Sequence, residues 1–207
     1  MQKTGLYALT AILAFALIFA FLPGADRTGP KTDATLRGVE LRLFPARDAD
    51  AVWSFSAKNV SSNPVSNETL LTGISGGKRV LKERDKTGKL TGRETLDATL
   101  DAPDLTIDGQ DDMTTVKASI RLVKECAGIV MTGTPENPVK IEQGYGFTAP
   151  VADITSPFLN GHAEKLRMSF QFDLADMDND TSSTSLNLDS KETCENGKLV
   201  PRAKSKT

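Results

Sequence analysis

The sequence has only one histidine, one tryptophan and two cysteines among its 207 residues. One imidazole and two cysteines far apart in sequence cannot supply the clustered ligands of a typical zinc site. A single histidine also leaves little for acid–base chemistry near neutral pH. Beyond the N-terminal segment, no stretch of ten residues carries apolar side chains at helical spacing. These absences disfavour an α/β fold and predict a protein that is not an enzyme and holds no metal or cofactor.

Two short motifs resemble functional sites but lack the required context. Residues 73–77 read GISGG, and Ser75 is followed by the only histidine, His162, as in a hydrolase with a nucleophile elbow. An elbow needs a strand, a tight turn and a helix in a parallel α/β fold, and the sequence shows no such alternation. The acidic stretch 176–180 starts like a calcium loop but has no glycine at the sixth position. We therefore interpret both motifs as turns.

The charge is small overall, at −2, but unevenly distributed. Residues 191–207 are basic, the first 24 residues contain one lysine, and the body between them is acidic. An acidic body repels polyanions, so we expect no nucleic-acid partner. The basic residues 191–207 are expected to form a flexible tail.

Residues 6–22 form an uncharged apolar run. As a helix it would span roughly 25 Å, the short limit for a bilayer-crossing segment. It is slightly longer than the apolar core of a signal peptide, and no small-x-small cleavage pattern follows it. We therefore expect residues 1–24 to be a membrane anchor rather than a cleaved signal segment, followed by a linker at 25–36. Either segment places the body outside the cytoplasm.

In the rest of the chain, apolar and polar residues alternate with a period of two. The clearest examples are residues 39–43, 53–57, 96–102, 116–122 and 166–174. Such alternation is typical of antiparallel strands with one apolar face. Pro103 interrupts the alternation and reverses its phase, which predicts a bulge or strand break. Residues 37–190 are thus predicted to be all β, with about eight to ten strands in a sandwich, a barrel or a jellyroll.

Two further features bear on partners and compartment. Cys126 and Cys194 are a candidate disulfide in an exported chain, the alternative being two unpaired thiols. Residues 78–93 contain seven basic and two acidic residues. They form either a charged hairpin tip that keeps the protein soluble or a contact for anionic groups. The candidates for that contact are Lys78, Arg79, Lys82 and Arg84.

An N-terminal anchor followed directly by short strands resembles the lipopolysaccharide transport (Lpt) family, above all its LptC-like and OstA-like periplasmic components. Residues 38–60, GVELRLFPARDADAVWSFSAKNV, look like that family's first strand pair. Residues 96–133, LDATLDAPDLTIDGQDDMTTVKASIRLVKECAGIVMTG, look like its repeated unit of strand, acidic turn and strand. The resemblance implies an open, twisted, two-sheet antiparallel β-jellyroll after a single N-terminal transmembrane helix.

The same resemblance implies a role in lipid transport. The protein would hold a lipopolysaccharide-like amphipathic lipid in its groove, anchored in the inner membrane with the β-domain on the periplasmic or extracytoplasmic side. It would bridge an ABC transporter to a downstream β-jellyroll by pairing edge strands. The alternative is a non-catalytic structural or interaction β-sandwich of the cell envelope with no lipid ligand. The lipid-groove candidates are Leu41, Leu43, Trp53, Phe55, Val116, Ile120, Leu122, Leu166, Met168, Phe170, Phe172 and Leu174.

Overall fold

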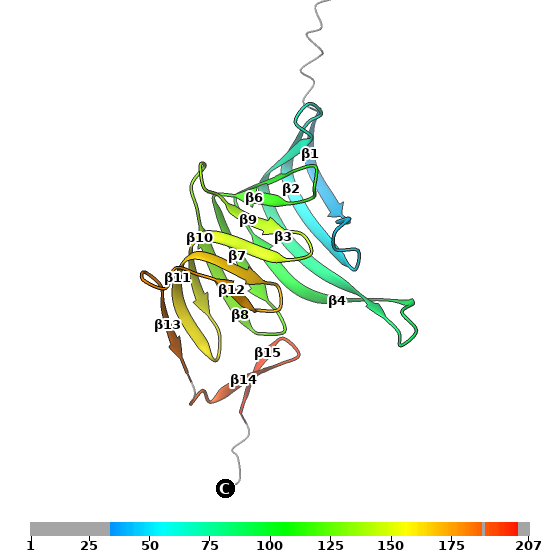
Figure 1. Cartoon of the computed structure of the whole chain (residues 1–207). Helices are drawn as coiled ribbons and strands as arrows, with labels where there is room; N and C mark the ends of the chain where they lie inside the picture. Colours follow the sequence, from blue (N-terminus) through cyan, green and yellow to red (C-terminus); the bar gives the residue numbers. More distant parts are fainter. Residues whose placement is uncertain (1–33, 188, 203–207) are drawn as a thin grey trace, which may run out of the picture. The chain divides into compact units, whose positions relative to one another are not determined.

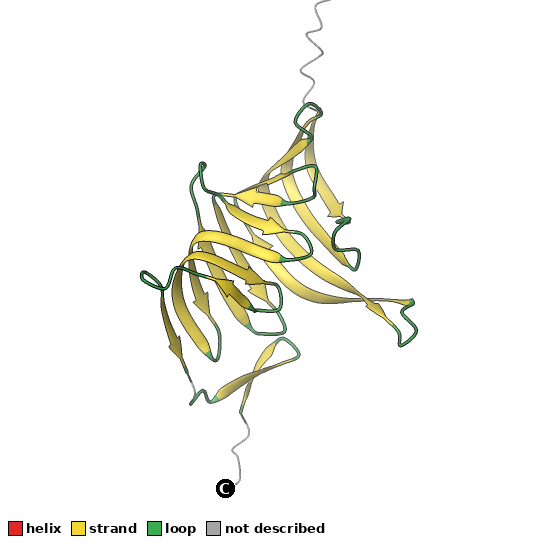
Figure 2. Cartoon of the chain, in the orientation of Figure 1, coloured by secondary structure: helices red, strands yellow, loops and turns green. Residues whose placement is uncertain are grey.

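The computed structural model describes residues 34–187 and 189–202, and this part of the chain contains strands and turns but no helix (Figures 1 and 2). The predicted anchor at 1–24 lies outside the described residues, as does most of the predicted linker at 25–36. The first strand begins at Ala34, inside the range predicted as linker.

The described residues form fifteen strands, and all the pairings between them are antiparallel. The first eight are β1 (Ala34–Leu43), β2 (Ala51–Asn63), β3 (Glu68–Arg84), β4 (Leu90–Asp101), β5 (Asp104–Ile107), β6 (Met113–Thr115), β7 (Lys117–Leu122) and β8 (Ala127–Thr132). The others are β9 (Val139–Glu142), β10 (Gly146–Thr155), β11 (Leu159–Ser169), β12 (Leu174–Asp176), β13 (Ser183–Leu186), β14 (Glu192–Glu195) and β15 (Lys198–Pro201).

Several strands are broken or bent near their middle, which explains why there are more than the predicted eight to ten. Pro103 lies between β4 and β5, so the break predicted from its sequence position is confirmed. Proline lacks the N–H that a continuous ladder requires. On the neighbouring strand β3, Gly73 lies beside this break. It has a φ of 62°, and its N–H donates to the carbonyl of Pro103 at 3.0 Å. Val116 separates β6 from β7, and residues 133–138 separate β8 from β9.

The strands close into a ring of hydrogen-bonded neighbours. Its order is β3, β4, β7, β8, β10, β9, β6 and β5, and β5 pairs again with β3. The ring closes because β3 and β10 run past the breaks and pair with both halves of the broken strands. The predicted open, two-sheet jellyroll is therefore wrong, and the fold is a closed eight-stranded barrel with extra strands. Sequence periodicity assigns each side chain to a face but does not determine how far a sheet curls.

The extra strands extend the sheet on two sides of the ring. On one side β2 pairs with β3, and β1 pairs with β2 (Figure 1). On the other side β11 pairs with β10, while β12 and β13 pair with successive parts of β11. The outer edges of β1, β12 and β13 have no strand partner among the described residues. These strands form the two flanks of the barrel.

The predicted strand at 166–174 is wrong beyond Ser169. There β11 ends, and the chain turns through residues 170–173 before β12 starts. The Ser169 hydroxyl accepts hydrogen bonds from the backbone N–H groups of Gln171 and Asp173, both at 3.1 Å. Phe172 takes the left-handed conformation, with a φ of 66°, which is uncommon for a bulky residue. The alternation of apolar residues thus continues through a turn instead of along one strand.

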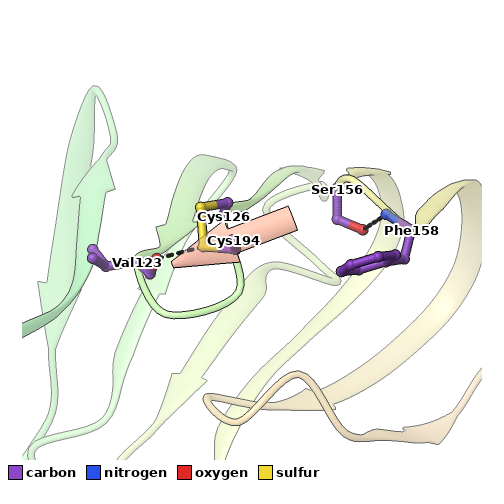
Figure 3. Close-up of a disulfide and its surroundings, with 5 residues drawn as sticks. All are labelled: Val123, Cys126, Ser156, Phe158 and Cys194. Carbon is purple, nitrogen blue, oxygen red and sulfur yellow. Dashed lines mark hydrogen bonds between the residues drawn. A yellow bond between two sulfur atoms is a disulfide. The ribbon is translucent and has the colours of Figure 1, made fainter. Parts of the chain in front are cut away.

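The C-terminal segment is also more ordered than predicted. Residues 192–201, expected to be part of a flexible tail, form the β14–β15 hairpin, which is a separate two-stranded sheet. A disulfide joins Cys194 of β14 to Cys126 in the turn between β7 and β8, with a Cα–Cα distance of 5.6 Å. Figure 3 shows this link next to Val123. The bond fastens the hairpin to the barrel, which accounts for order in a segment of polar composition.

Candidate functional site

The interior of the barrel is a single apolar core, and most of the predicted groove residues converge there. Trp53, Phe55, Ile120, Leu122, Leu166, Met168 and Phe170 are buried in this one cluster. Leu41, Leu43 and Phe172 are half-buried and pack against it. Val116 and Leu174 are instead 40% and 46% exposed, because they lie at a strand break and after the turn described above. Ten of the twelve predicted residues therefore contact one apolar interior.

Aromatic side chains pack against one another in this interior. The rings of Trp53 and Phe55 are stacked with centroids 5.7 Å apart, and Phe170 lies 6.0 Å from Trp53 and 6.1 Å from Phe147. The sequence prediction missed Phe147, together with the buried Met113 and Met131. Each stands in an apolar stretch too short for a clear alternation. Methionine side chains are flexible and adapt to irregular neighbours, so this lining can change shape.

The apolar interior continues on to the two flanks. Apolar side chains of β1, and Leu159 at the start of β11, face the core but are only partly covered. The half-buried apolar residues packed against the core are Val39, Leu41, Leu43, Ile74, Leu159, Phe172 and Met177. An apolar surface that begins inside the barrel thus reaches solvent beyond the ring.

Arg79, predicted to be part of an exposed basic contact, is instead a buried residue that is 3% exposed. It stands directly opposite Trp53 in the pairing of β2 with β3, and its guanidinium lies 4.1 Å from the centre of the Phe170 ring. The guanidinium forms ion pairs with Asp97 of β4 and, at 2.5 Å, with Asp48. The alternation of β3 turns this side chain inward, so the dense run of charges around it does not indicate its position.

Two other predicted basic contacts are engaged within the molecule. Lys82 donates to the carbonyl of Ala49 at 3.1 Å, and Arg84 forms an ion pair with Asp50 at 2.6 Å. Lys78 is exposed. The four residues predicted from sequence to bind an anion therefore do not form one exposed cluster.

The loop between β1 and β2, residues 44–50, lies over the Arg79 end of the core and is held mainly by polar contacts. Its buried side chain is Pro45. The N–H of Ala46 donates to Asp111 at 3.2 Å, and Arg47 pairs with Asp112 and donates to the carbonyl of Gln110 at 3.2 Å. These contacts join the loop to the turn between β5 and β6. We call residues 44–50 the capping loop.

Hydrogen bonds in the capping loop shift several pKa values. Hydrogen bonds from Arg84 hold the pKa of Asp50 below its ordinary value, and Asp50 raises the pKa of Arg84. A hydrogen bond to Asp112 likewise raises the pKa of Arg47. These ion pairs are therefore fully charged at neutral pH.

We expect the Asp50–Arg84 pair to stabilise the fold in a pH-dependent way. Because the pKa of Asp50 is lower in the folded state, its contribution is complete above the unfolded value of about 4. That contribution is lost as the pH falls through the folded-state pKa. The difference in free energy of unfolding between the wild type and Asp50→Asn should therefore be constant above about pH 5 and shrink as the pH falls from there to about pH 2. Urea denaturation across this range measures it, and a pH-independent difference would contradict the assignment.

The residues of the hydrolase-like motif are not joined in the structure. Ser75 lies on β3 opposite Ser56, whereas His162 lies on β11 opposite Asp153. The Nδ1 atom of His162 is 2.8 Å from Asp153 Oδ1, on an exposed surface. Among residues 34–187 and 189–202, no group of three or more His, Cys, Asp or Glu side chains could hold a metal ion. In the same part of the chain no helix has the length and apolar character needed to cross a membrane.

Comparison with known proteins adds no family to this description. No protein-family model matches the chain, and no curated protein matches it either.

Proposed function

We propose that this protein binds an amphipathic lipid in the apolar interior of its barrel and passes it to a neighbouring protein in the cell envelope. The observation that carries this proposal is the continuity of the core with half-buried apolar side chains on both flanks. A ligand entering from a flank meets an apolar surface along its whole path. Each methylene group buried there contributes about 0.8 kcal/mol.

The interior is filled by its own side chains, so lipid entry requires some of them to move. Seven of the groove candidates are at most 3% exposed. The flexible Met113, Met131 and Met168 and the breaks in the strands supply places where the wall can adjust. The free edges of β1, β12 and β13 offer unpaired backbone groups to other β-proteins. An ABC transporter and a downstream β-domain are the partners we propose for these edges.

The proposed location is the extracytoplasmic face of the inner membrane, with lipopolysaccharide or a similar lipid as ligand. The uncharged run at 6–22 supports a membrane anchor. The Cys126–Cys194 disulfide supports an oxidising compartment such as the periplasm. No catalytic role is included in this proposal.

The second candidate is a structural or interaction protein of the envelope without a lipid ligand. The complete burial of Trp53, Phe147 and their neighbours favours it, since a sealed core stabilises a fold without any ligand.

Site-specific photo-crosslinking in cells distinguishes the two candidate functions. With p-benzoylphenylalanine in place of Leu43 on β1 we expect a lipid adduct. In place of Val65, which is 95% exposed, we expect no lipid adduct. Adducts with protein alone at position 43 would favour the second candidate.

A further inference from the structure

The capping loop places a carboxylate on a buried cation at one end of the apolar core. Asp48 belongs to this loop, and its Oδ2 atom lies 2.5 Å from the guanidinium of Arg79. We propose that Asp48 occupies the site of an anionic headgroup, and that the capping loop is a lid which such a headgroup displaces. This inference rests on the proposed lipid-binding function and specifies the class of ligand, an alkyl chain with a single anionic head.

The charges at the site favour an anion once the lid has moved. Asp97 belongs to β4, so its ion pair with Arg79 remains with the barrel when the loop leaves. Lys124 adds a second cation at 3.9 Å from Asp97. Removal of Asp48 therefore leaves the buried Arg79 guanidinium with one carboxylate partner, Asp97, which is shared with Lys124. A carboxylate or phosphate oxygen restores the balance that Asp48 provides in the closed form.

Unpartnered hydrogen-bond donors lie in the same cluster. Gln143 is 3% exposed, and its side-chain oxygen accepts the hydrogen bond from Trp53 Nε1 at 3.0 Å. Its amide nitrogen Nε2 has no partner among the described residues, and neither has Nε of Arg79. Unpartnered buried donors are costly, so the cluster has capacity for further acceptor oxygens. A headgroup with several oxygens matches this need better than one carboxylate.

The neighbours of Arg79 also indicate where the alkyl chain lies. Its guanidinium is 4.1 Å from the centre of the Phe170 ring, and the Phe170 ring lies next to those of Trp53 and Phe147. A head bound at Arg79 therefore has the aromatic part of the core beside it. One cationic point bordering a continuous apolar surface fits an amphiphile and not a free inorganic anion.

The contacts of the capping loop allow it to leave. Apart from buried Pro45 and the Asp48–Arg79 ion pair, which the headgroup would replace, the loop is held by hydrogen bonds and ion pairs at or near the surface. Such contacts exchange for contacts with water at a small net cost. Asp112 also links the two parts of the site, since it pairs with Arg47 of the loop and accepts from the backbone N–H of Gln143 at 2.8 Å. Movement of the loop thus loosens the strand end that carries Gln143.

The test compares two probes with the same chain, dodecyl phosphate and 1-dodecanol. The full-length protein in dodecyl maltoside micelles is titrated with each probe while the emission of Trp53, the only tryptophan, is recorded. We expect Asp48→Asn to tighten the apparent binding of dodecyl phosphate about fivefold or more, and to leave dodecanol unaffected. The matched control is Asp178→Asn, which removes the ion pair to Lys165 on β11 and should change neither titration. Thermal unfolding of both variants checks that they are folded.

The other outcomes separate this inference from the proposed function. If Asp48→Asn tightens both probes equally, or leaves dodecyl phosphate binding unchanged, the anionic site under the lid is refuted while lipid binding stands. If neither probe alters Trp53 emission in the wild type or either variant, both the inference and the proposed function are refuted.

Discussion

Replacing Arg79 with methionine is expected to lower the free energy of unfolding by about 3–5 kcal/mol. Methionine keeps much of the aliphatic volume but removes the cation between Asp97 and Asp48. Asp97 is 6% exposed, so its carboxylate would remain buried without its main partner. Breaking one side of a buried ion pair is costly for that reason. Urea denaturation followed by Trp53 fluorescence at neutral pH measures the loss.

Two variants test the cause of this expected loss. Arg84→Met removes a similar cation from β3, but its pair with Asp50 is exposed, and we expect a far smaller loss of stability than Arg79→Met causes. The double variant Arg79→Met with Asp97→Asn should recover part of the stability, because the more deeply buried of the two carboxylates no longer carries an unpaired charge. Equal effects of Arg79→Met and Arg84→Met would show that the buried ion pair does not stabilise this end of the barrel.

Phe170→Ala is expected to cost about 3–5 kcal/mol, comparable to the loss at Arg79. Its ring is 3% exposed and contacts the rings of Trp53 and Phe147 as well as the guanidinium of Arg79. The substitution leaves a cavity where the other three groups meet. We expect the turn at residues 170–173 to fill this cavity only partly. The free energy of unfolding again provides the measurement.

Phe158→Ala is the matched control for this prediction. Phe158 lies in the turn between β10 and β11, as Figure 3 shows, and is 42% exposed. Phe158→Ala should lower the free energy of unfolding far less than Phe170→Ala, because less apolar surface is buried at position 158. Similar losses at the two positions would mean that the core does not extend to Phe170.

The positions of many strands could be predicted because each has one buried face. The alternation in β2 and β7 appears directly in the sequence, and Pro103 marked a real break. Closure of the ring could not be predicted in this way. It depends on β3 pairing with both β4 and β5, and therefore on long-range register across the break. Alternation fixes the face of each residue and so excludes a one-residue slip, but it does not identify which strands pair across the break.

The candidate site shows the same division. Trp53 and Phe170 could be assigned to the interior because they are large apolar residues on an alternating face. Arg79 could not, since nothing in its charged segment separates it from Lys78 or Lys82. Its environment depends on Trp53 across the strand pair and on Asp48 from the capping loop. Leu174 was misassigned because the turn at Ser169 ends the strand without glycine or proline.

Native mass spectrometry of the full-length protein shows whether the interior of the barrel holds a lipid. The protein is purified from its own host in a mild non-ionic detergent and released from the micelle in the gas phase. If the interior binds lipid, the folded species retains an amphipathic lipid and loses it when the protein is unfolded. A folded protein that is always free of lipid, with intact Cys126–Cys194 disulfide, would contradict the claim that the interior binds lipid.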